Sequence, residues 1–284
     1  MEYFRPDNLA EAYSLFDRFG EEALPVAGTS FFMGHREELF DEVEAVVSLQ
    51  DVGLRYIKVE DGQLRLGSTT TLADLYSSEI TNSGALSIFS ETVSKLKIKE
   101  VRNVGTVGGE VCICGEVDLP TTLHAMDATV VLGSAEGQTS MPIKDFHLGY
   151  LSNALEIGQI VLEVTLPVPP PNTGASFQKF ERTATDLPIV NVMGRVTLDK
   201  KGRYSDAKIA VGAAVPVPER AFEAEKMMIG HAPSEELIRS TALAVSQEIQ
   251  SLADHRASAE LRSLWVKCAV EDALTTATRR AKGE

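Results

Sequence analysis

Cysteines are few in this sequence and long apolar runs are absent, and each shortage excludes a class of protein. The 284 residues include 3 cysteines. An odd and low count does not support a disulfide framework and fits a reducing cytoplasm. No apolar run approaches the roughly 18 residues that span a bilayer, and the first residues lack the basic and apolar segments of a secretory signal. We therefore expect a cytoplasmic protein without a transmembrane segment.

Basic charge is also scarce. The sequence has 27 Lys and Arg against 41 Asp and Glu, which gives a formal net charge of -14. A nucleic-acid surface needs a basic stripe, so we expect no nucleic-acid partner. Hydrophobic residues make up 44% of the chain, enough for the cores of two or three small domains.

Glycine is concentrated in one stretch, residues 101–122. Gly105, Gly108 and Gly109 fall within five positions, interleaved with small and β-branched residues. Glycine allows close approach of the backbone to another group, and the N–H groups of such a loop can surround a phosphate. The pattern predicts a tight anion-binding loop, with a glycine-rich turn that holds no ligand as the alternative.

A second candidate loop follows a short apolar strand near the N-terminus. Residues 23–27 run into Gly28, Thr29 and Ser30, where backbone amides and small hydroxyls can also meet a phosphate. The alternative is a plain strand-to-helix connection in which Thr29 or Ser30 caps the helix.

Apolar periodicity, caps and turn residues predict mixed secondary structure. Asp61-Gly62 between two alternating segments is a strong hairpin signal. The expected helices cover residues 9–19, 72–76, 86–101, 120–126, 219–228, 235–252 and 257–280. The expected strands cover residues 23–27, 43–49, 56–60, 63–67, 128–132, 157–166, 176–180, 189–198 and 207–215.

Three consecutive prolines, Pro169 to Pro171, mark the clearest boundary, because they continue neither a helix nor a strand ladder. Beyond them, strands followed by helices predict a small α+β domain.

These segments together resemble the FAD-binding medium subunit of the molybdenum hydroxylases, the family of xanthine and carbon monoxide dehydrogenases. Residues 102–109 and 26–30 are similar to the two FAD signatures of that family. Further similar segments cover essentially the whole chain: residues 66–71, 118–120, 177–179 and 255–262. The resemblance implies an α+β fold, with a two-subdomain FAD-binding region of the PCMH/vanillyl-alcohol-oxidase-like type (1–54 and 55–171). A C-terminal α+β domain of the carbon monoxide dehydrogenase flavoprotein type (172–284) follows it.

The resemblance also implies a site for FAD between the subdomains. Residues 26–30 and 106–110 would hold the pyrophosphate and ribityl chain through backbone amides and hydroxyls. Asp118 would accept from a ribityl or ribose hydroxyl, Val161 would touch the flavin or adenine, and Lys179 would lie near the isoalloxazine. The implied cofactor-binding residues are Val26, Ala27, Gly28, Thr29, Ser30, Thr106, Gly108, Gly109, Glu110, Ile113, Asp118, Val161 and Lys179.

Two positions depart from the family pattern. Ala27 stands where glycine is usual, and its methyl group is tolerated only if its φ is negative. Glu110 replaces Asn or Asp. A carboxylate 4 Å from a phosphate charge is repelled by about 4 kcal/mol at an effective dielectric constant near 20. We therefore expect Glu110 to turn away from the pyrophosphate or to bond a sugar hydroxyl.

Cys112 and Cys114 would face the same way on a strand. A metal site needs further ligands, and Cys268 lies far along the chain in an expected helix. The pair is therefore interpreted as small buried residues beside the cofactor, and no metal is expected on this chain. No histidine is predicted to be catalytic; the five are His35, His124, His147, His231 and His255.

By this resemblance the chain is an oxidoreductase subunit that passes electrons through FAD. The implied partners are a small subunit with [2Fe-2S] clusters and a large molybdopterin subunit, in a dimer of heterotrimers. NAD, a quinone or another external carrier would accept the electrons. The alternatives are a stand-alone FAD-dependent oxidase, a scaffold subunit that has lost FAD, and a protein of this fold that binds another nucleotide.

Overall fold

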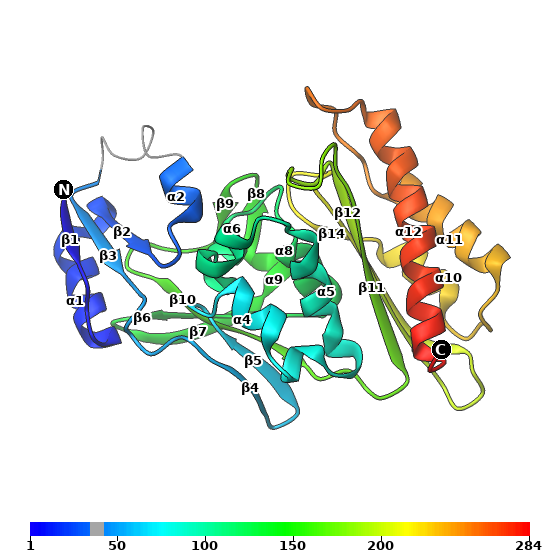
Figure 1. Cartoon of the computed structure of the whole chain (residues 1–284), viewed down its shortest axis with the longest axis horizontal. Helices are drawn as coiled ribbons and strands as arrows, with labels where there is room; N and C mark the ends of the chain where they lie inside the picture. Colours follow the sequence, from blue (N-terminus) through cyan, green and yellow to red (C-terminus); the bar gives the residue numbers. More distant parts are fainter. Residues whose placement is uncertain (35–42) are drawn as a thin grey trace.

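The computed structural model describes residues 1–34 and 43–284, which form three units arranged along the long axis of the molecule (Figure 1). The N-terminal unit is a parallel sheet in the order β1-β3-β2 with α1 packed against it. Asn8 caps α1 by accepting a hydrogen bond from the backbone N–H of Glu11. The elements of this unit are β1 (Glu2–Phe4), α1 (Leu9–Phe19), η1 (Gly20–Glu22), β2 (Ala23–Val26), α2 (Ser30–Gly34) and β3 (Ala45–Ser48).

The middle unit is built on an antiparallel sheet in the order β4-β5-β10-β6-β7. The predicted hairpin is confirmed: Asp61 and Gly62 both have positive φ, 51° and 72°, as a tight two-residue turn requires. The strands are β4 (Ile57–Glu60), β5 (Gln63–Gly67), β6 (Thr129–Ser134), β7 (Gly137–Pro142) and β10 (Ile160–Pro167).

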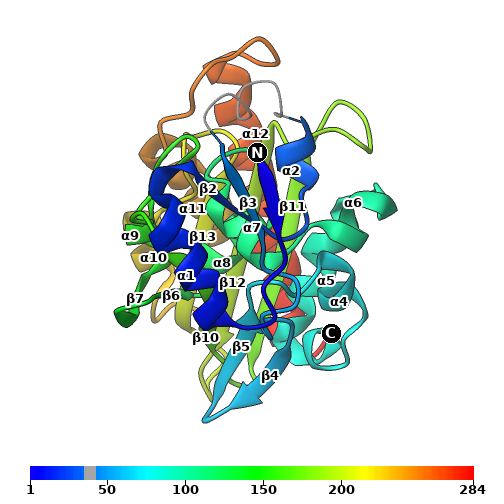
Figure 2. The same cartoon turned by 90° about the vertical axis from the view of Figure 1, so that its left-hand side faces the viewer.

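Short helices lie between this sheet and the C-terminal sheet (Figure 1), and Figure 2 shows the molecule from the end that carries the N-terminal unit. Thr71 and Asp74 form a capping box at the start of α4, which fixes the predicted helix there. The elements are α4 (Leu72–Ser77), η2 (Ile80–Asn82), η3 (Gly84–Leu86), α5 (Ser87–Lys95), α6 (Lys99–Val104), α7 (Val107–Cys112), α8 (Leu119–Ala125), α9 (Ile143–Phe146), β8 (His147–Gly149) and β9 (Ser152–Asn153).

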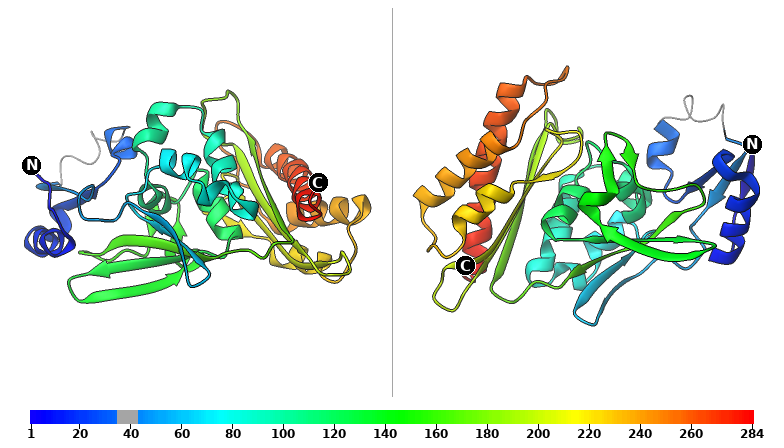
Figure 3. Two further views of the ribbon diagram at one scale, coloured as in Figure 1. Left: turned by 60° about the horizontal axis from the view of Figure 1, so that its bottom comes forward. Right: turned by 180° about the vertical axis from the view of Figure 1, so that it is seen from behind.

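The C-terminal unit is an antiparallel sheet in the order β11-β12-β13-β14. Helices α10 to α12 cover one face, and α5 and α8 of the middle unit lie on the other (Figure 3). The elements are β11 (Thr173–Phe180), β12 (Val190–Leu198), β13 (Tyr204–Gly212), β14 (Glu219–Arg220), α10 (Phe222–Met228), α11 (Glu235–Glu248) and α12 (Ala259–Ala281).

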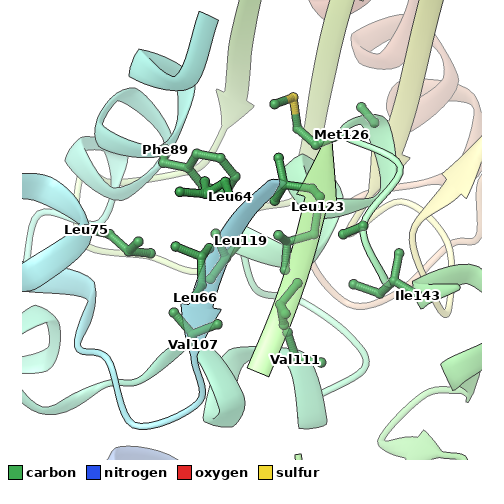
Figure 4. Packing of buried hydrophobic residues seen from close by; sticks show 14 of the residues in the cluster. Leu64, Leu66, Leu75, Phe89, Val107, Val111, Leu119, Leu123, Met126 and Ile143 are labelled. Atoms are coloured by element: carbon green, nitrogen blue, oxygen red, sulfur yellow. The ribbon is translucent and has the colours of Figure 1, made fainter. Parts of the chain in front are cut away.

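The core of the middle unit is continuous with the C-terminal sheet. Its buried cluster contains Leu119 and Leu123 of α8 (Figure 4) together with Phe177 of β11 and Met193 of β12. Polar contacts also tie α8 to this sheet at both ends. Asn191 of β12 donates to Asp118 over 3.0 Å, and Arg220 of β14 donates to Asp127 over 2.9 Å.

Two predicted helices are shorter than expected. The single helix expected over 86–101 is wrong: Leu96 and Ile98 are extended, and the break separates α5 from α6 while both side chains line a cavity. The helix expected from Glu219 starts only at Phe222. Arg220 belongs to β14 instead, and its guanidinium is held by Glu225 over 2.5 Å and by Asp127.

The cysteine pair does not lie on a strand, so the two side chains are not related by strand alternation. Cys112 is the last residue of α7, and Cys114 follows in an irregular segment. Both thiols are free. Within the described residues, no group of three or more His, Cys, Asp or Glu side chains is arranged to hold a metal ion.

Candidate functional site

Two neighbouring cavities lie between the N-terminal unit, α7 and the C-terminal sheet. Their volumes are about 360 Å³ and about 300 Å³, in the range of cofactor and ligand sites. Both are lined by Ser30, Phe31, Glu110 and Ile113. These four residues therefore mark the junction at which one elongated ligand can reach into both cavities.

All the residues predicted to bind the cofactor line one or both cavities. The first cavity brings together Val26, Ala27, Gly28, Thr29, Ser30, Thr106, Gly108, Gly109, Glu110, Ile113 and Val161. The second brings together Ser30, Glu110, Ile113, Asp118 and Lys179.

The loop after β2 presents free backbone donors to the first cavity. Among the described residues, the N–H groups of Gly28, Thr29 and Ser30 donate to no protein acceptor. Thr29 has a φ of 57°, an unusual value for a β-branched residue and one that marks local strain. Ala27 is not among the residues with positive φ, so its methyl group introduces no backbone strain. Three successive free amides form a concave anion site.

Gly28 is required by the second loop. A Cβ at Gly28 would lie 1.8 Å from the carbonyl oxygen of Val104, the last residue of α6. The two glycine-containing loops therefore touch backbone to backbone, a contact that only glycine permits.

The second loop differs from the expectation of a loop rich in free amides. Residues 107–112 form α7, and Thr106 caps it by accepting from the N–H of Gly109 over 3.2 Å. The N–H groups of Val107 and Gly108 donate to the carbonyls of Thr70 and Ser68 over 2.9 and 2.8 Å. These amides hold the loop against the segment after β5 and are not available to an anion.

Two hydroxyl groups that the sequence analysis did not assign complete the first cavity. Ser68 and Thr69 are buried and line this cavity. Within the described part of the chain, neither Oγ of Ser68 nor Oγ1 of Thr69 has a hydrogen-bond partner. A buried hydroxyl without a partner is costly, and both hydroxyls are placed where a polar ligand in the cavity can bond them. The similarity of residues 66–71 to the family pattern was a signal in the sequence that could have identified Ser68 and Thr69 as site residues.

Asp118 and Lys179 form a buried ion pair beside the second cavity. Lys179 Nζ lies 3.0 Å from Asp118 Oδ2 and 3.0 Å from Glu181 Oε2. Burial opposes the charged form of Lys179, but the two carboxylates outweigh it, and its pKa is raised. Asp118 also accepts from Asn191, so its oxygens are largely occupied by protein donors.

A histidine pair supports α7 from behind. His147 Nε2 lies 2.8 Å from the carbonyl oxygen of Val111, so this nitrogen donates, and His147 Nδ1 lies 3.0 Å from His124 Nε2. Both rings are buried. Burial lowers both pKa values, and that of His124, which also faces His147 and Arg220, falls to about 3. The pair is a neutral structural support; His35 lies outside the described residues.

The wall of the second cavity includes a loop that the sequence analysis did not single out. Residues 185–188 connect β11 to β12 and line this cavity with Glu116 and Val117. Arg256 anchors this wall, because it forms an ion pair with Glu116 and donates to the carbonyl of Pro188 over 3.3 Å. No local pattern in residues 185–188 signals a cavity, since their position depends on the pairing of β11 with β12.

Comparison with known proteins assigns the chain to a family. Residues 1–169 match the FAD binding domain in molybdopterin dehydrogenase, and residues 175–277 match the CO dehydrogenase flavoprotein C-terminal domain. The chain belongs to this molybdopterin dehydrogenase flavoprotein family. The predicted family and α+β fold are thus confirmed.

Relatives in this family match over nearly their whole length. The 6-hydroxypseudooxynicotine dehydrogenase complex subunit alpha of Paenarthrobacter nicotinovorans is 29% identical over 99% of this chain and 95% of its own. The carbon monoxide dehydrogenase medium chain of Afipia carboxidovorans is 28% identical over 99% and 98%. A solved carbon monoxide dehydrogenase of Hydrogenophaga pseudoflava, which lacks the Mo-pyranopterin moiety of its cofactor, superimposes with a TM-score of 0.93 at 26% identity, covering 99% of this chain and 98% of that one.

Membership in this family confirms that the chain carries an FAD-binding domain and is an oxidoreductase subunit of the molybdenum hydroxylase type. Among the described residues, no helix has the length and apolar character needed to cross a membrane. The comparisons name no residue that contacts the cofactor, so the predicted site residues remain a prediction.

Proposed function

We propose that this chain is the flavoprotein subunit of a molybdenum hydroxylase and passes electrons from [2Fe-2S] clusters of a partner subunit to an external acceptor. The observation that carries the proposal is the first cavity. Free amides of Gly28, Thr29 and Ser30 lie on one wall, and the partnerless hydroxyls of Ser68 and Thr69 line the same cavity. This donor set fits the diphosphate and ribityl hydroxyls of FAD.

The second cavity suits the isoalloxazine ring. Leu96, Ile98 and Val117 supply apolar surface, and Lys179 supplies one buried cation at its edge. Val161 lines only the first cavity, so we assign it to the remaining part of the cofactor. We place the FAD-binding region at 1–54 and 55–171 and the C-terminal domain at 172–284.

Bound FAD would supply the exchange of electrons between a donor and an acceptor. The residues of this chain bind and orient it, and none is needed to transfer a proton in catalysis. Asp118 helps to fix the position of Lys179 and the start of α8, and through Asn191 it connects the cavity to the C-terminal sheet. This assignment replaces the expected role of Asp118 as a sugar ligand with a supporting role.

The names of two relatives support the proposal of partner subunits. One relative is a subunit of a dehydrogenase complex and another is a medium chain. We propose a small iron–sulfur subunit and a large molybdopterin subunit, with two copies of each chain in the assembly. NAD, a quinone or another carrier would accept the electrons. The substrate would bind on the large subunit, so this chain does not define it. Three free thiols support the cytoplasm as its location.

The visible spectrum of the purified chain tests the proposal, followed by mass analysis of the material that denaturation releases. We expect a flavin band and about one FAD per chain, and reduction of that flavin by a reduced [2Fe-2S] protein. A colourless chain that takes up neither FAD nor another nucleotide would support the scaffold alternative. Reduction of the flavin by an organic substrate, in the absence of other subunits, would support the stand-alone oxidase.

A further inference from the structure

Glu110 occupies the junction of the two cavities. It lies in the first turn of α7, is half-buried, and lines both cavities with Ser30, Phe31 and Ile113. The expectation that it turns away from the pyrophosphate or bonds a sugar hydroxyl remains a prediction. A ligand that extends from the free amides of the first cavity into the second passes this side chain.

The charges around Glu110 are unbalanced. The groups that face it are Asp118 before α8, Lys179 of β11, and the backbone N–H of Leu119. Lys179 is already paired with Asp118 and Glu181, so three carboxyl groups share one cation. Among the described residues, no Lys or Arg forms an ion pair with Glu110.

The other charged groups of the second cavity do not correct this imbalance. Glu116 is paired with Arg256, and Asp186 is paired with Arg182 over 3.4 Å. Burial and the charge of Asp118 raise the pKa of Glu110 to about 7, although Leu119 and Lys179 oppose the shift. A diphosphate on the neighbouring amides of residues 28–30 would add negative charge and disfavour the carboxylate further.

We propose that FAD binds to the neutral form of Glu110, so that binding takes up one proton from solvent and the Glu110 carboxylic acid donates a hydrogen bond to the cofactor where the two cavities meet. The carboxyl group thereby serves as a hydrogen-bond donor to the cofactor. This inference rests on the proposed function and adds a dependence of cofactor affinity on pH.

Because binding takes up a proton, the affinity for FAD should fall as the pH rises. Below about pH 7 Glu110 is already protonated in the free chain, so affinity is independent of pH there. Above that value the free chain must gain a proton on binding, and the Kd for FAD rises toward tenfold per pH unit. A glutamine at position 110 donates without titrating, and its affinity stays constant.

The experiment measures the Kd for FAD with the full-length apo chain from pH 5.5 to 8.5, using quenching of flavin fluorescence. We expect the wild type to bind roughly tenfold more weakly at pH 8.5 than at pH 7.5, and Glu110→Gln to bind with the same Kd at both. The matched control is Glu136→Gln on the exposed turn after β6, which should keep the wild-type dependence.

Calorimetry of FAD binding to the wild type, in two buffers of different ionisation enthalpy, gives a second measurement that needs no variant. Uptake of close to one proton per FAD at pH 8 is expected. Uptake of none, or equal pH dependence in the wild type and Glu110→Gln, overturns the role of Glu110 and leaves the proposed function intact. Failure of every variant to bind FAD at any pH contradicts the proposed function itself.

Discussion

The ammonium group of Lys179 lies 3.0 Å from the carboxylate of Asp118, and this contact joins β11 to the residue that precedes α8. The Lys179 side chain is 3% exposed, so water cannot replace a lost partner. We expect Lys179→Met to lower the free energy of unfolding by about 3–5 kcal/mol, because it leaves a buried carboxylate unpaired.

The double variant Lys179→Met/Asp118→Asn is the matched control, since it removes the lysine and the more buried of its two carboxylate partners and leaves only the more exposed Glu181 without a cation. It should recover most of the loss in urea denaturation followed by circular dichroism. A double variant no more stable than Lys179→Met would show that packing of the lysine chain, and not the unpaired charge, sets the cost.

Gly28 and Gly109 line the same cavity but should respond differently to alanine. A Cβ at Gly28 would meet the Val104 carbonyl at 1.8 Å, whereas a Cβ at Gly109 would meet only the Thr106 hydroxyl at 3.1 Å. We expect Gly28→Ala to destabilise the apo chain by about 3 kcal/mol or more. Gly109→Ala should change stability by less than about 1 kcal/mol.

The half-exposed position of Gly109 on the cavity wall predicts a second difference. Its added methyl group would occupy space that the cofactor needs, so FAD affinity should fall at least roughly tenfold, or about 1.4 kcal/mol. Thermal denaturation without FAD and FAD titration separate the two effects. Normal FAD affinity in Gly109→Ala would place the cofactor away from α7.

The hydroxyls of Ser68 and Thr69 should affect stability and binding in opposite directions. Neither has a partner among the described residues, so Ser68→Ala and Thr69→Val remove a desolvation cost from the apo chain. Each variant should be as stable as the wild type or more stable without FAD. Each should bind FAD with a loss of about 0.5–1.5 kcal/mol, measured by fluorescence titration. A loss of apo stability in both variants would contradict their role as ligands.

The neutral pair His124 and His147 predicts weaker folding in mild acid. Their pKa values are lowered by burial in the folded chain, so the unfolded chain binds protons that the folded chain does not. Stability is complete above about pH 6.5 and falls as the pH decreases toward 3, the folded pKa of His124. His124 alone should contribute about 1.4 kcal/mol per pH unit between pH 6 and 5.

Urea denaturation at pH 7, 6 and 5 measures this slope. His124→Gln retains an amide donor toward His147 Nδ1 but does not titrate. The change in its free energy of unfolding with pH should therefore be smaller by about 1.4 kcal/mol per pH unit, which corresponds to one proton. His231→Gln, which alters an exposed histidine, should leave the slope unchanged. Equal slopes in all three proteins would mean that the unfolded state does not gain these protons.

Much of the fold was predictable because local signals agree with the tertiary structure. Asn8, the Asp61-Gly62 turn and the Thr71 capping box each fix an element through contacts within a few residues. The break at Leu96 to Ile98 was not predictable in this way. Those residues continue an apolar helical pattern, and they are extended because a cavity wall formed by other elements requires it.

The candidate site shows the same division. Its predicted residues were named through the resemblance to the family, since residues 26–30 and 102–109 are similar to the two FAD signatures. The hydrogen-bond partner of each group could not be predicted. The N–H groups of Val107 and Gly108 donate to carbonyls of residues 68–70, which are distant in sequence. The helix that contains Cys112 was not predicted either, although the Thr106 cap that starts it is a local signal.

Helix α8 is held by the C-terminal sheet at both ends, by Asn191 and Lys179 at Asp118 and by Arg220 and Arg195 at Asp127. A chimera joined at the proline linker would therefore pair an α8 from one parent with a sheet from another and lose these contacts. Successful exchange of C-terminal halves between relatives should require α8 to be exchanged with the sheet. Helix α8 and the C-terminal sheet therefore form one structural unit, although α8 belongs to the first matched domain and most of the sheet to the second.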